Sequence, residues 1–190
     1  MATTGILSPG VNFEDRLIGS LEEMERTVTH LKGLDYRVVL TSGSFDLIHL
    51  GHVKYLGRAK EFGDVLVVGV DSDAKIRKRK GDDRPMVPEE ERLELLAHQR
   101  PVDLIYLKDD DDGRWDLIKA VQPHVLVLSE DNTYTDEERQ MLLDHCERIE
   151  VLERQASVTT SERIRQLHMH LGEELAQRLP AIIRDIVRSR

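Results

Sequence analysis

The 190-residue sequence has a single cysteine, Cys146, and no apolar run long enough to cross a bilayer. One cysteine excludes an intrachain disulfide and a cysteine-rich zinc cluster. A membrane-spanning helix would need about 20 consecutive apolar residues. Residues 1–12 also lack the basic start and apolar stretch of a secretory signal. These absences lead us to expect a cytoplasmic protein with no membrane partner.

Basic residues are fewer than acidic residues: the sequence has 27 Lys and Arg and 36 Asp and Glu, which gives a net charge of −9. A general nucleic-acid binder needs clustered basic residues, so no nucleic-acid partner is expected. The one basic run, residues 75–80 (KIRKRK), has no aromatic neighbours, and we interpret it as a mobile loop that closes over a polyphosphate. The acidic run Asp109–Asp112 is expected to be a solvated loop and helix cap rather than a metal site.

Apolar runs and amphipathic stretches alternate along most of the chain. Strands are expected at residues 37–42, 65–70, 103–107, 124–128 and 148–152, with helices at 50–62, 88–100, 114–121 and 136–146. Five strands rich in Val, Ile and Leu that alternate with helices predict an α/β fold with a doubly wound, parallel, five-stranded Rossmann-like sheet. Ligands of such sheets bind beyond the carboxyl ends of the strands, where the strand order reverses.

Both ends of the chain predict additional helices. Ser20 and Glu23 have the spacing of a capping box at the start of an apolar stripe. A second stripe comprises Leu175, Leu179, Ile182, Ile183 and Ile186, and Pro180 is expected to start or kink this last helix. Both stripes are expected to be packing surfaces. A subunit interface is the alternative for the C-terminal stripe, because twofold dimers are the commonest oligomers.

The most informative stretch is residues 43–52 (GSFDLIHLGH), which link an expected strand to an expected helix. The free backbone N–H groups and the dipole of a helix N-terminus favour an anion. His49 and His52 are three residues apart and would share one face of the first turn, which Gly51 leaves open. The alternative is two polar surface residues, but the strand–turn–helix context favours a phosphate site.

This stretch resembles the cytidylyltransferase-like nucleotidyltransferases, which transfer a nucleoside monophosphate from CTP or ATP to a phosphorylated small molecule and release pyrophosphate. The resemblance covers about Val38 to Ile164 and includes Gly63-Asp64, Val70 to Asp73, Lys80-Gly81, Arg84-Pro85, Glu91-Arg92, Val102-Asp103 and Arg154 to Ser161. The three pairs from Lys80 to Arg92 look most like the heptose-1-phosphate adenylyltransferases. The segment 154–161 is equally similar to the glycerol-3-phosphate cytidylyltransferases.

The resemblance implies that the chain divides into three parts. Together with the chemistry of the side chains, it also implies a role for each candidate residue. The parts are an N-terminal tail and helix (1–35), a nucleotidyltransferase domain (36–165) and a C-terminal helical extension (166–190). His49 and His52 would stabilise charge on the α-phosphate, and Lys80, with Lys78 as the alternative, would neutralise the leaving pyrophosphate. The expected nucleotide-binding residues are Gly43, Ser44 and Phe45 through their backbone N–H groups, together with Gly51, Arg92, Arg154, Thr159 and Thr160.

The sequence specifies the acceptor substrate and the base of the nucleotide less fully. Asp46 and Asp73 are expected at strand ends, where they either orient the acceptor or Mg²⁺ or cap the following turn. Mg²⁺ would arrive with the nucleoside triphosphate, without a dedicated protein site. Residues 129–132 (SEDN) replace the family's Gly-Gly-Asp-Tyr or Gly-Asp-Asp-Trp, and Ser157 replaces a glycine. We expect a homodimer that uses ATP and a sugar 1-phosphate. The alternatives are CTP with an alditol or alcohol phosphate, and a non-catalytic nucleotide-binding module.

Overall fold

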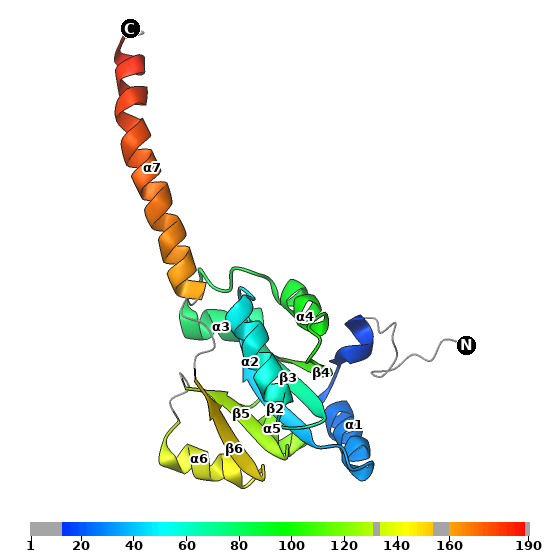
Figure 1. Ribbon diagram of the computed structural model, residues 1–190. Coiled ribbons are helices and arrows are strands. Elements are labelled where there is room, and N and C mark those ends of the chain that lie inside the picture. The colour runs from blue at the N-terminus through cyan, green and yellow to red at the C-terminus, as the bar shows by residue number, and fades with distance from the viewer. Residues whose placement is uncertain (1–12, 131–133, 154–159, 189–190) are drawn as a thin grey trace, which may run out of the picture. The chain divides into compact units, whose positions relative to one another are not determined.

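The computed structural model describes residues 13–130, 134–153 and 160–188 and consists of a parallel sheet covered by helices, followed by one long helix (Figure 1). The elements are η1 (Phe13–Arg16), β1 (Leu17–Ile18), α1 (Leu21–Gly33), β2 (Val38–Gly43), α2 (Leu50–Lys60), β3 (Val65–Asp71), α3 (Asp73–Lys80), α4 (Glu89–Ala97), β4 (Leu104–Lys108), α5 (Asp116–Val121), β5 (Val125–Ser129), α6 (Asp136–Leu143), β6 (Arg148–Leu152) and α7 (Thr160–Arg188). The contacts between residues divide the chain into two compact units, residues 1–155 and 156–190.

All strands of the six-stranded sheet run parallel, in the order β1-β4-β3-β2-β5-β6. The chain moves outward from β2 through β3 to β4 and then returns to β5 on the other side of β2, so the order reverses between β2 and β5. The five expected strands are confirmed as β2 to β6. The additional strand, β1, pairs only at Leu17 and Ile18 with β4, and a two-residue strand is too short to show any periodicity in sequence.

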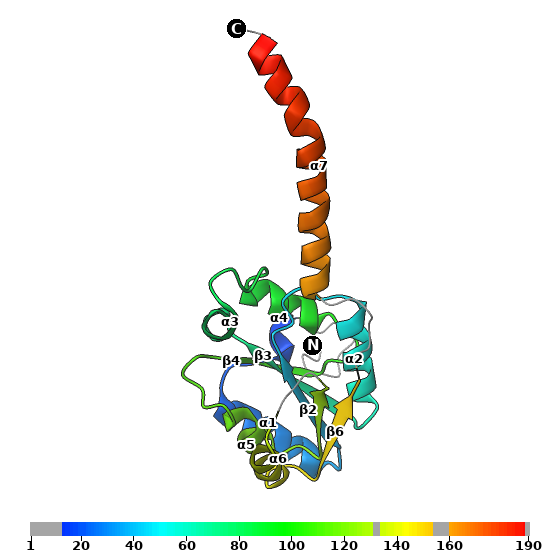
Figure 2. The ribbon, with the colours of Figure 1, turned by 90° about the vertical axis from the view of Figure 1, so that its left-hand side faces the viewer.

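Helices cover both faces of this sheet, so its central strands β2 and β3 are mostly apolar. Every residue of β3 is buried. Helices α1, α5 and α6 pack on one face, and α2 and α4 pack on the other (Figure 2). This double covering confirms the expected doubly wound α/β fold and leaves the carboxyl ends of the strands, with the loops that follow them, as the place for a site.

The helix ends show which local sequence signals predicted the position of a helix correctly. Ser20 caps α1 by accepting a hydrogen bond from the N–H of Glu23 at 3.1 Å. The Glu23 carboxylate accepts from the N–H of Gly19, one residue before the cap, so only half of the expected capping box forms. The expected helices between the strands are confirmed as α2, α4, α5 and α6, with ends that differ by a few residues.

The expected loop at the basic run is wrong, and so is one of the two alternatives for Pro180, the start of a helix; a kink at Pro180 stays a prediction. The basic run 75–80 lies in helix α3 rather than in a loop, because Ser72 caps the helix, Ile76 anchors it in the core, and Gly81 at φ 92° ends it. One buried apolar residue gives no periodicity, which is why the sequence did not reveal this helix. Pro180 lies inside α7 and does not start a helix.

Helix α7 has 29 residues and continues through the expected boundary between residues 165 and 166. Large apolar side chains lie exposed along it, at Leu167, Leu171, Leu175 and Leu179. Within the described part of the chain, no helix combines the length and apolar character required to cross a membrane.

Candidate active site

The turn after β2 has a conformation suited to holding an anion. Phe45 has a positive φ of 48°, and its two neighbours do not. A left-handed residue next to right-handed ones is the backbone pattern of anion-binding nests, and Phe45 supplies the left-handed residue of such a pattern here. A left-handed residue other than glycine costs about 1–2 kcal/mol, and burial of the Phe45 ring compensates that cost, with its edge 3.1 Å from the position of a Cβ on Gly43. Residues 43–45 are called the phosphate turn below.

The two histidines of the motif lie together at the start of α2. His49 is the N-cap, and its Nδ1 accepts a hydrogen bond from the N–H of Gly51 at 3.0 Å. In a neutral imidazole the nitrogen that accepts carries no proton, so the proton of His49 is on Nε2. The His49 ring stacks on His52 with centroids 4.2 Å apart, and Phe45 meets His52 edge-on at 5.5 Å. Two imidazole donors are thus fixed next to the phosphate turn.

Burial and neighbouring charge keep the His52 imidazole neutral at physiological pH. Burial, His49 and Lys80 lower the pKa of His52 to about 4, against a smaller opposing effect of the Leu47 backbone. Among the described residues, His52 Nδ1 is a buried side-chain nitrogen without a hydrogen-bond partner. Such groups are rare in folded proteins, and a catalytic role is one reason for their presence. A polyphosphate placed beside this ring would favour its protonated form.

Arg92 is committed to protein partners. Its side chain is fully buried, and its guanidinium donates to the carbonyl oxygens of Ser44 at 2.5 Å and Val87 at 3.0 Å and to Asp73 at 2.8 Å. A buried group committed to three protein acceptors cannot contact a ligand without leaving them. In this arrangement Arg92 fixes the carbonyl of the phosphate turn, and its contact with a nucleotide stays a prediction.

Asp46 is likewise committed to the protein. Its carboxylate accepts from the Arg84 guanidinium at 2.6 Å and from the backbone N–H groups of Met86 and Val87 at 2.7 and 3.1 Å. Only 7% of the side chain is exposed. None of these three partners lies in the turn that follows β2, so the alternative of a cap on that turn is wrong, and the contact with acceptor or Mg²⁺ stays a prediction. Asp46 instead joins the phosphate turn to the loop before α4.

Asp73 is the first residue of α3 rather than the end of a strand, which corrects its expected position. Its carboxylate accepts from Arg92 and Arg77, and its N–H donates to the Glu89 carboxylate at 2.6 Å. Asp73 therefore connects α3 to α4. The aspartate that does end β3 is Asp71, for which the sequence indicated no role.

The expected leaving-group cation, Lys80, lies at the end of α3 within electrostatic range of the histidines. Its pKa is lowered by burial first and then by Arg79, against the opposing charge of Asp46. The alternative, Lys78, has a 74% exposed side chain and pairs with Asp110 at 3.3 Å. The geometry therefore favours Lys80 over Lys78.

The point where the strand order reverses carries two hydroxyl groups that the sequence did not reveal. The β2–β5 ladder pairs Val39 with Val125 and Leu40 with Leu126. Beyond it, Thr41 Oγ1 and Tyr55 OH form a hydrogen bond of 2.7 Å, and their oxygens lie 3.0 and 3.2 Å from the Val127 carbonyl oxygen. One hydroxyl therefore donates to the other, and the second donates to that carbonyl. Burial raises the pKa of Tyr55 to about 12. These hydroxyls provide a hydrogen-bond donor to the Val127 carbonyl of β5 where β2 and β5 separate, next to the first turn of α2.

Residues 40–184 match the cytidylyltransferase-like family, a span that takes in the sheet from β2 onward, the phosphate turn, both histidines and most of α7. The chain belongs to the cytidylyltransferase-like family. It is therefore a nucleotidyltransferase.

Curated relatives of this cytidylyltransferase-like chain are considerably longer than the matched region. The bifunctional protein HldE of a Nitratiruptor species is 46% identical over 117 residues, which cover 62% of this chain and 25% of that protein. The bifunctional protein HldE of Aliarcobacter butzleri is 34% identical over 149 residues, which cover 78% of this chain and 31% of that protein. The chain thus aligns with about a quarter to a third of each relative.

Two solved structures share the architecture. The lipopolysaccharide core biosynthesis protein of Thermoplasma volcanium is 28% identical with a TM-score of 0.54, covering 63% of this chain and 96% of that one. Pantoate-beta-alanine ligase of Francisella tularensis is 14% identical with a TM-score of 0.52, covering 76% of this chain and 68% of that one, and this likeness shows the fold alone.

Three expected nucleotide ligands of the family lie beyond what the structure describes. Arg154 and Thr159 fall outside the described residues. Thr160 is the first residue of α7, but its side chain is not described. Their roles stay predictions.

Proposed function

We propose that this chain transfers AMP from ATP to a sugar 1-phosphate, forming an ADP-sugar and releasing pyrophosphate. The observation that carries the proposal is the stacked pair of His49 and His52, held beside a phosphate turn in which Phe45 is left-handed. A module that only bound nucleotides would need the turn. It would not need two fixed imidazoles, which are suited to charge that develops on the α-phosphate during reaction.

In this mechanism the acceptor's phosphate oxygen attacks the α-phosphorus, and the bond from that phosphorus to the bridging oxygen of pyrophosphate breaks. A phosphate monoester is largely ionised at neutral pH, so no general base is required and alignment contributes most. Fixed N–H donors on His49 and His52 would stabilise the transition state, and the Lys80 ammonium would neutralise pyrophosphate.

Magnesium would bind through the triphosphate rather than through protein carboxylates. Asp46, Asp71 and Asp73 all accept from arginine side chains, so their oxygens are already used. The donor set therefore fits an ion that is coordinated mainly by phosphate oxygens and water, which is usual for Mg²⁺. Bound there, the ion would supply charge neutralisation.

The choice of substrates rests on similarity. The pairs Lys80-Gly81, Arg84-Pro85 and Glu91-Arg92 resemble heptose-1-phosphate adenylyltransferases, and the solved relative at 28% identity is a lipopolysaccharide core biosynthesis protein. A lipopolysaccharide core is a saccharide, which favours a sugar acceptor. ATP and phosphorylated sugars are cytoplasmic compounds, and we propose that location for the enzyme.

The substrate pair is tested by measuring pyrophosphate release for ATP, CTP, GTP and UTP against heptose 1-phosphate, glycerol 3-phosphate and phosphocholine. We expect ATP with heptose 1-phosphate to exceed CTP by about 10- to 100-fold in kcat/KM, because one unpaired buried polar group at the base costs about 1–3 kcal/mol. Preferential release from CTP with glycerol 3-phosphate would move the assignment to the cytidylyltransferases. Release from no pair would favour the non-catalytic alternative.

We further propose that the enzyme is a homodimer formed through α7 of two copies. Leu167, Leu171, Leu175 and Leu179 are 49–63% exposed and repeat every four residues, which places them on one side of the helix. A stripe of this kind is stabilised when a second such helix covers it. A protein partner would bring its own apolar surface, but a second copy provides a matching one without a further component.

The dimer is tested by light scattering after size-exclusion chromatography. Wild type is expected at twice the chain mass and the Leu171→Glu/Leu175→Glu double variant at the chain mass. Met169→Glu is the matched control, because Met169 is 58% exposed but lies 200° around the helix from Leu171 at about 100° per residue. A monomeric wild type, or a dimer that persists in the double variant, would contradict this interface.

A further inference from the structure

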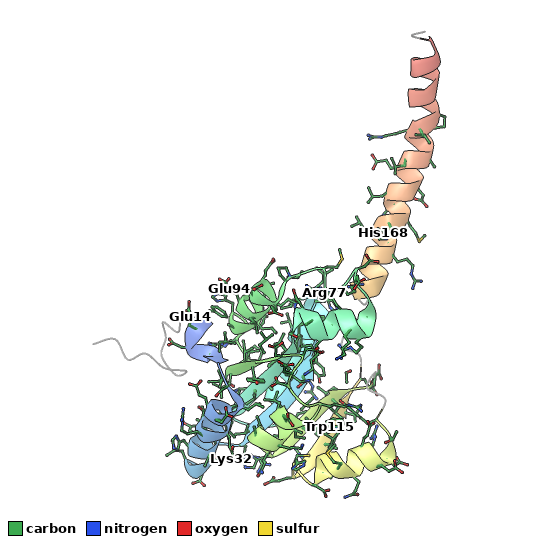
Figure 3. All side chains as sticks on the ribbon, turned by 180° about the vertical axis from the view of Figure 1, so that it is seen from behind. Glu14, Lys32, Arg77, Glu94, Trp115 and His168 are labelled. Carbon is green, nitrogen blue, oxygen red and sulfur yellow. The ribbon has the colours of Figure 1, made fainter. Side chains whose placement is uncertain are left out.

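Arg79 connects the phosphate turn to the central strand of the sheet. One nitrogen of its guanidinium, Nη2, donates to Ser44 Oγ at 2.7 Å and to Asp71 Oδ2 at 2.8 Å. Figure 3 shows the helix it belongs to, α3, with the neighbouring Arg77 labelled. The Arg79 side chain is 56% exposed. Its other guanidinium nitrogens have no hydrogen-bond partner among the described residues, so they remain available to a ligand above the turn.

Asp71 is built to hold this arginine. It ends β3, only 7% of its side chain is exposed, and its other oxygen lies 3.3 Å from the Lys108 ammonium. Burial raises the pKa of Asp71, but Lys108 and Arg79 outweigh burial and lower it overall. The carboxylate is therefore ionised at neutral pH, and a rigid strand fixes one side of the guanidinium.

The charged groups beside the phosphate turn favour the binding of a polyanion. The charged groups that act on Lys80 are Arg79, Arg84, Asp46 and Asp71, so three cations face two carboxylates beside the phosphate turn. This local positive excess stands against a net charge of −9 for the whole chain. Guanidinium groups bind phosphate oxygens through paired N–H donors, whereas an ammonium acts as a point charge.

We propose that Arg79 is a phosphate-binding residue of the nucleoside triphosphate site, and that Asp71 is the positioning residue that orients it. The inference rests on the proposed function of this site and adds a second cation to Lys80. Lys80 would neutralise the leaving group. Arg79, held at Ser44, would bind the phosphates that lie against the turn.

The test is calorimetric titration of the full chain and its variants with inorganic tripolyphosphate. This probe has no base and requires no acceptor, so its binding is independent of whether ATP, CTP or a particular sugar phosphate is the substrate. Arg79→Ala is expected to weaken binding at least tenfold, and Arg79→Lys less. Arg58→Ala is the matched control, because Arg58 is 53% exposed and pairs with Glu61 at the far end of α2. Unchanged binding in Arg79→Ala would overturn the proposal.

Asp71→Asn separates positioning from simple charge. Removal of a carboxylate near a polyanion site should strengthen binding if Asp71 contributes only its charge. If Asp71 orients Arg79, the variant should instead bind tripolyphosphate several-fold more weakly, and the loss should largely disappear in the Arg79→Ala background. Stronger binding in Asp71→Asn, or equal losses in both backgrounds, would contradict the positioning role. Circular dichroism of each variant distinguishes these results from unfolding.

Discussion

Replacement of His52 by alanine is expected to lower kcat about a hundredfold or more without unfolding the protein, because loss of one fixed transition-state donor costs roughly 2.7–4 kcal/mol. The ring is partly buried against Phe45 and His49, but none of the described helix caps depends on it. His49 differs, since it also caps α2. His49→Asn keeps an N-cap acceptor and removes the imidazole, so it should show a similar loss of kcat with little loss of stability.

The measurement is the steady-state rate of pyrophosphate release, together with thermal unfolding of each variant. His98→Ala is the control, because that side chain is 67% exposed at the C-cap of α4, where its imidazole lies 4.0 Å from the Glu94 carboxylate. The two site variants should lose kcat, and the control should not. Turnover near that of wild type in either site variant would remove that histidine from the transition-state site.

Lys80→Ala is expected to reduce kcat more than it reduces affinity for the nucleotide. A cation that neutralises the leaving pyrophosphate acts most strongly as the bond breaks, so its loss is felt in the transition state more than in the ground state. Lys78→Ala, two residues earlier on the same exposed helix, should have little effect because its side chain pairs with Asp110. The two variants remove the same charge and differ only in where it lies.

The comparison requires kcat and KM for ATP at saturating acceptor, with nucleotide affinity from equilibrium titration. Equal losses in kcat and affinity would indicate uniform binding by Lys80. A larger loss of kcat in Lys78→Ala would transfer the role to the alternative lysine.

The sequence revealed the parts of the site that are local along the chain. Residues 43–52 contain the phosphate turn and both histidines, and their positions follow from one strand end and one helix start. The apolar runs were equally informative, since buried parallel strands such as β3 consist almost wholly of Val and Leu. Such features depend on a few consecutive residues, and the sequence displays them directly.

The sequence did not reveal the contacts between distant segments. Arg92 lies buried among Ser44, Val87 and Asp73, and Asp46 binds the loop before α4. Partners 19 to 48 residues away are fixed only when α3 and α4 pack against the strand ends. Asp71 and Arg79 were missed for the same reason, because their importance lies in a contact between a strand end and a helix whose existence the sequence did not show.

The proposed reaction moves the adenylyl group of ATP, with its α-phosphate, to a sugar 1-phosphate. The most direct measurement uses ATP labelled at the α-phosphate, incubated with Mg²⁺ and heptose 1-phosphate, with the products separated and identified by mass. The label should appear in a compound with the mass of the acceptor plus AMP minus water, with one unlabelled pyrophosphate released for each molecule formed. His52→Ala should form this compound at least a hundredfold more slowly. Label that remains in ATP, or that appears as free AMP at the same rate with and without acceptor, would contradict the account.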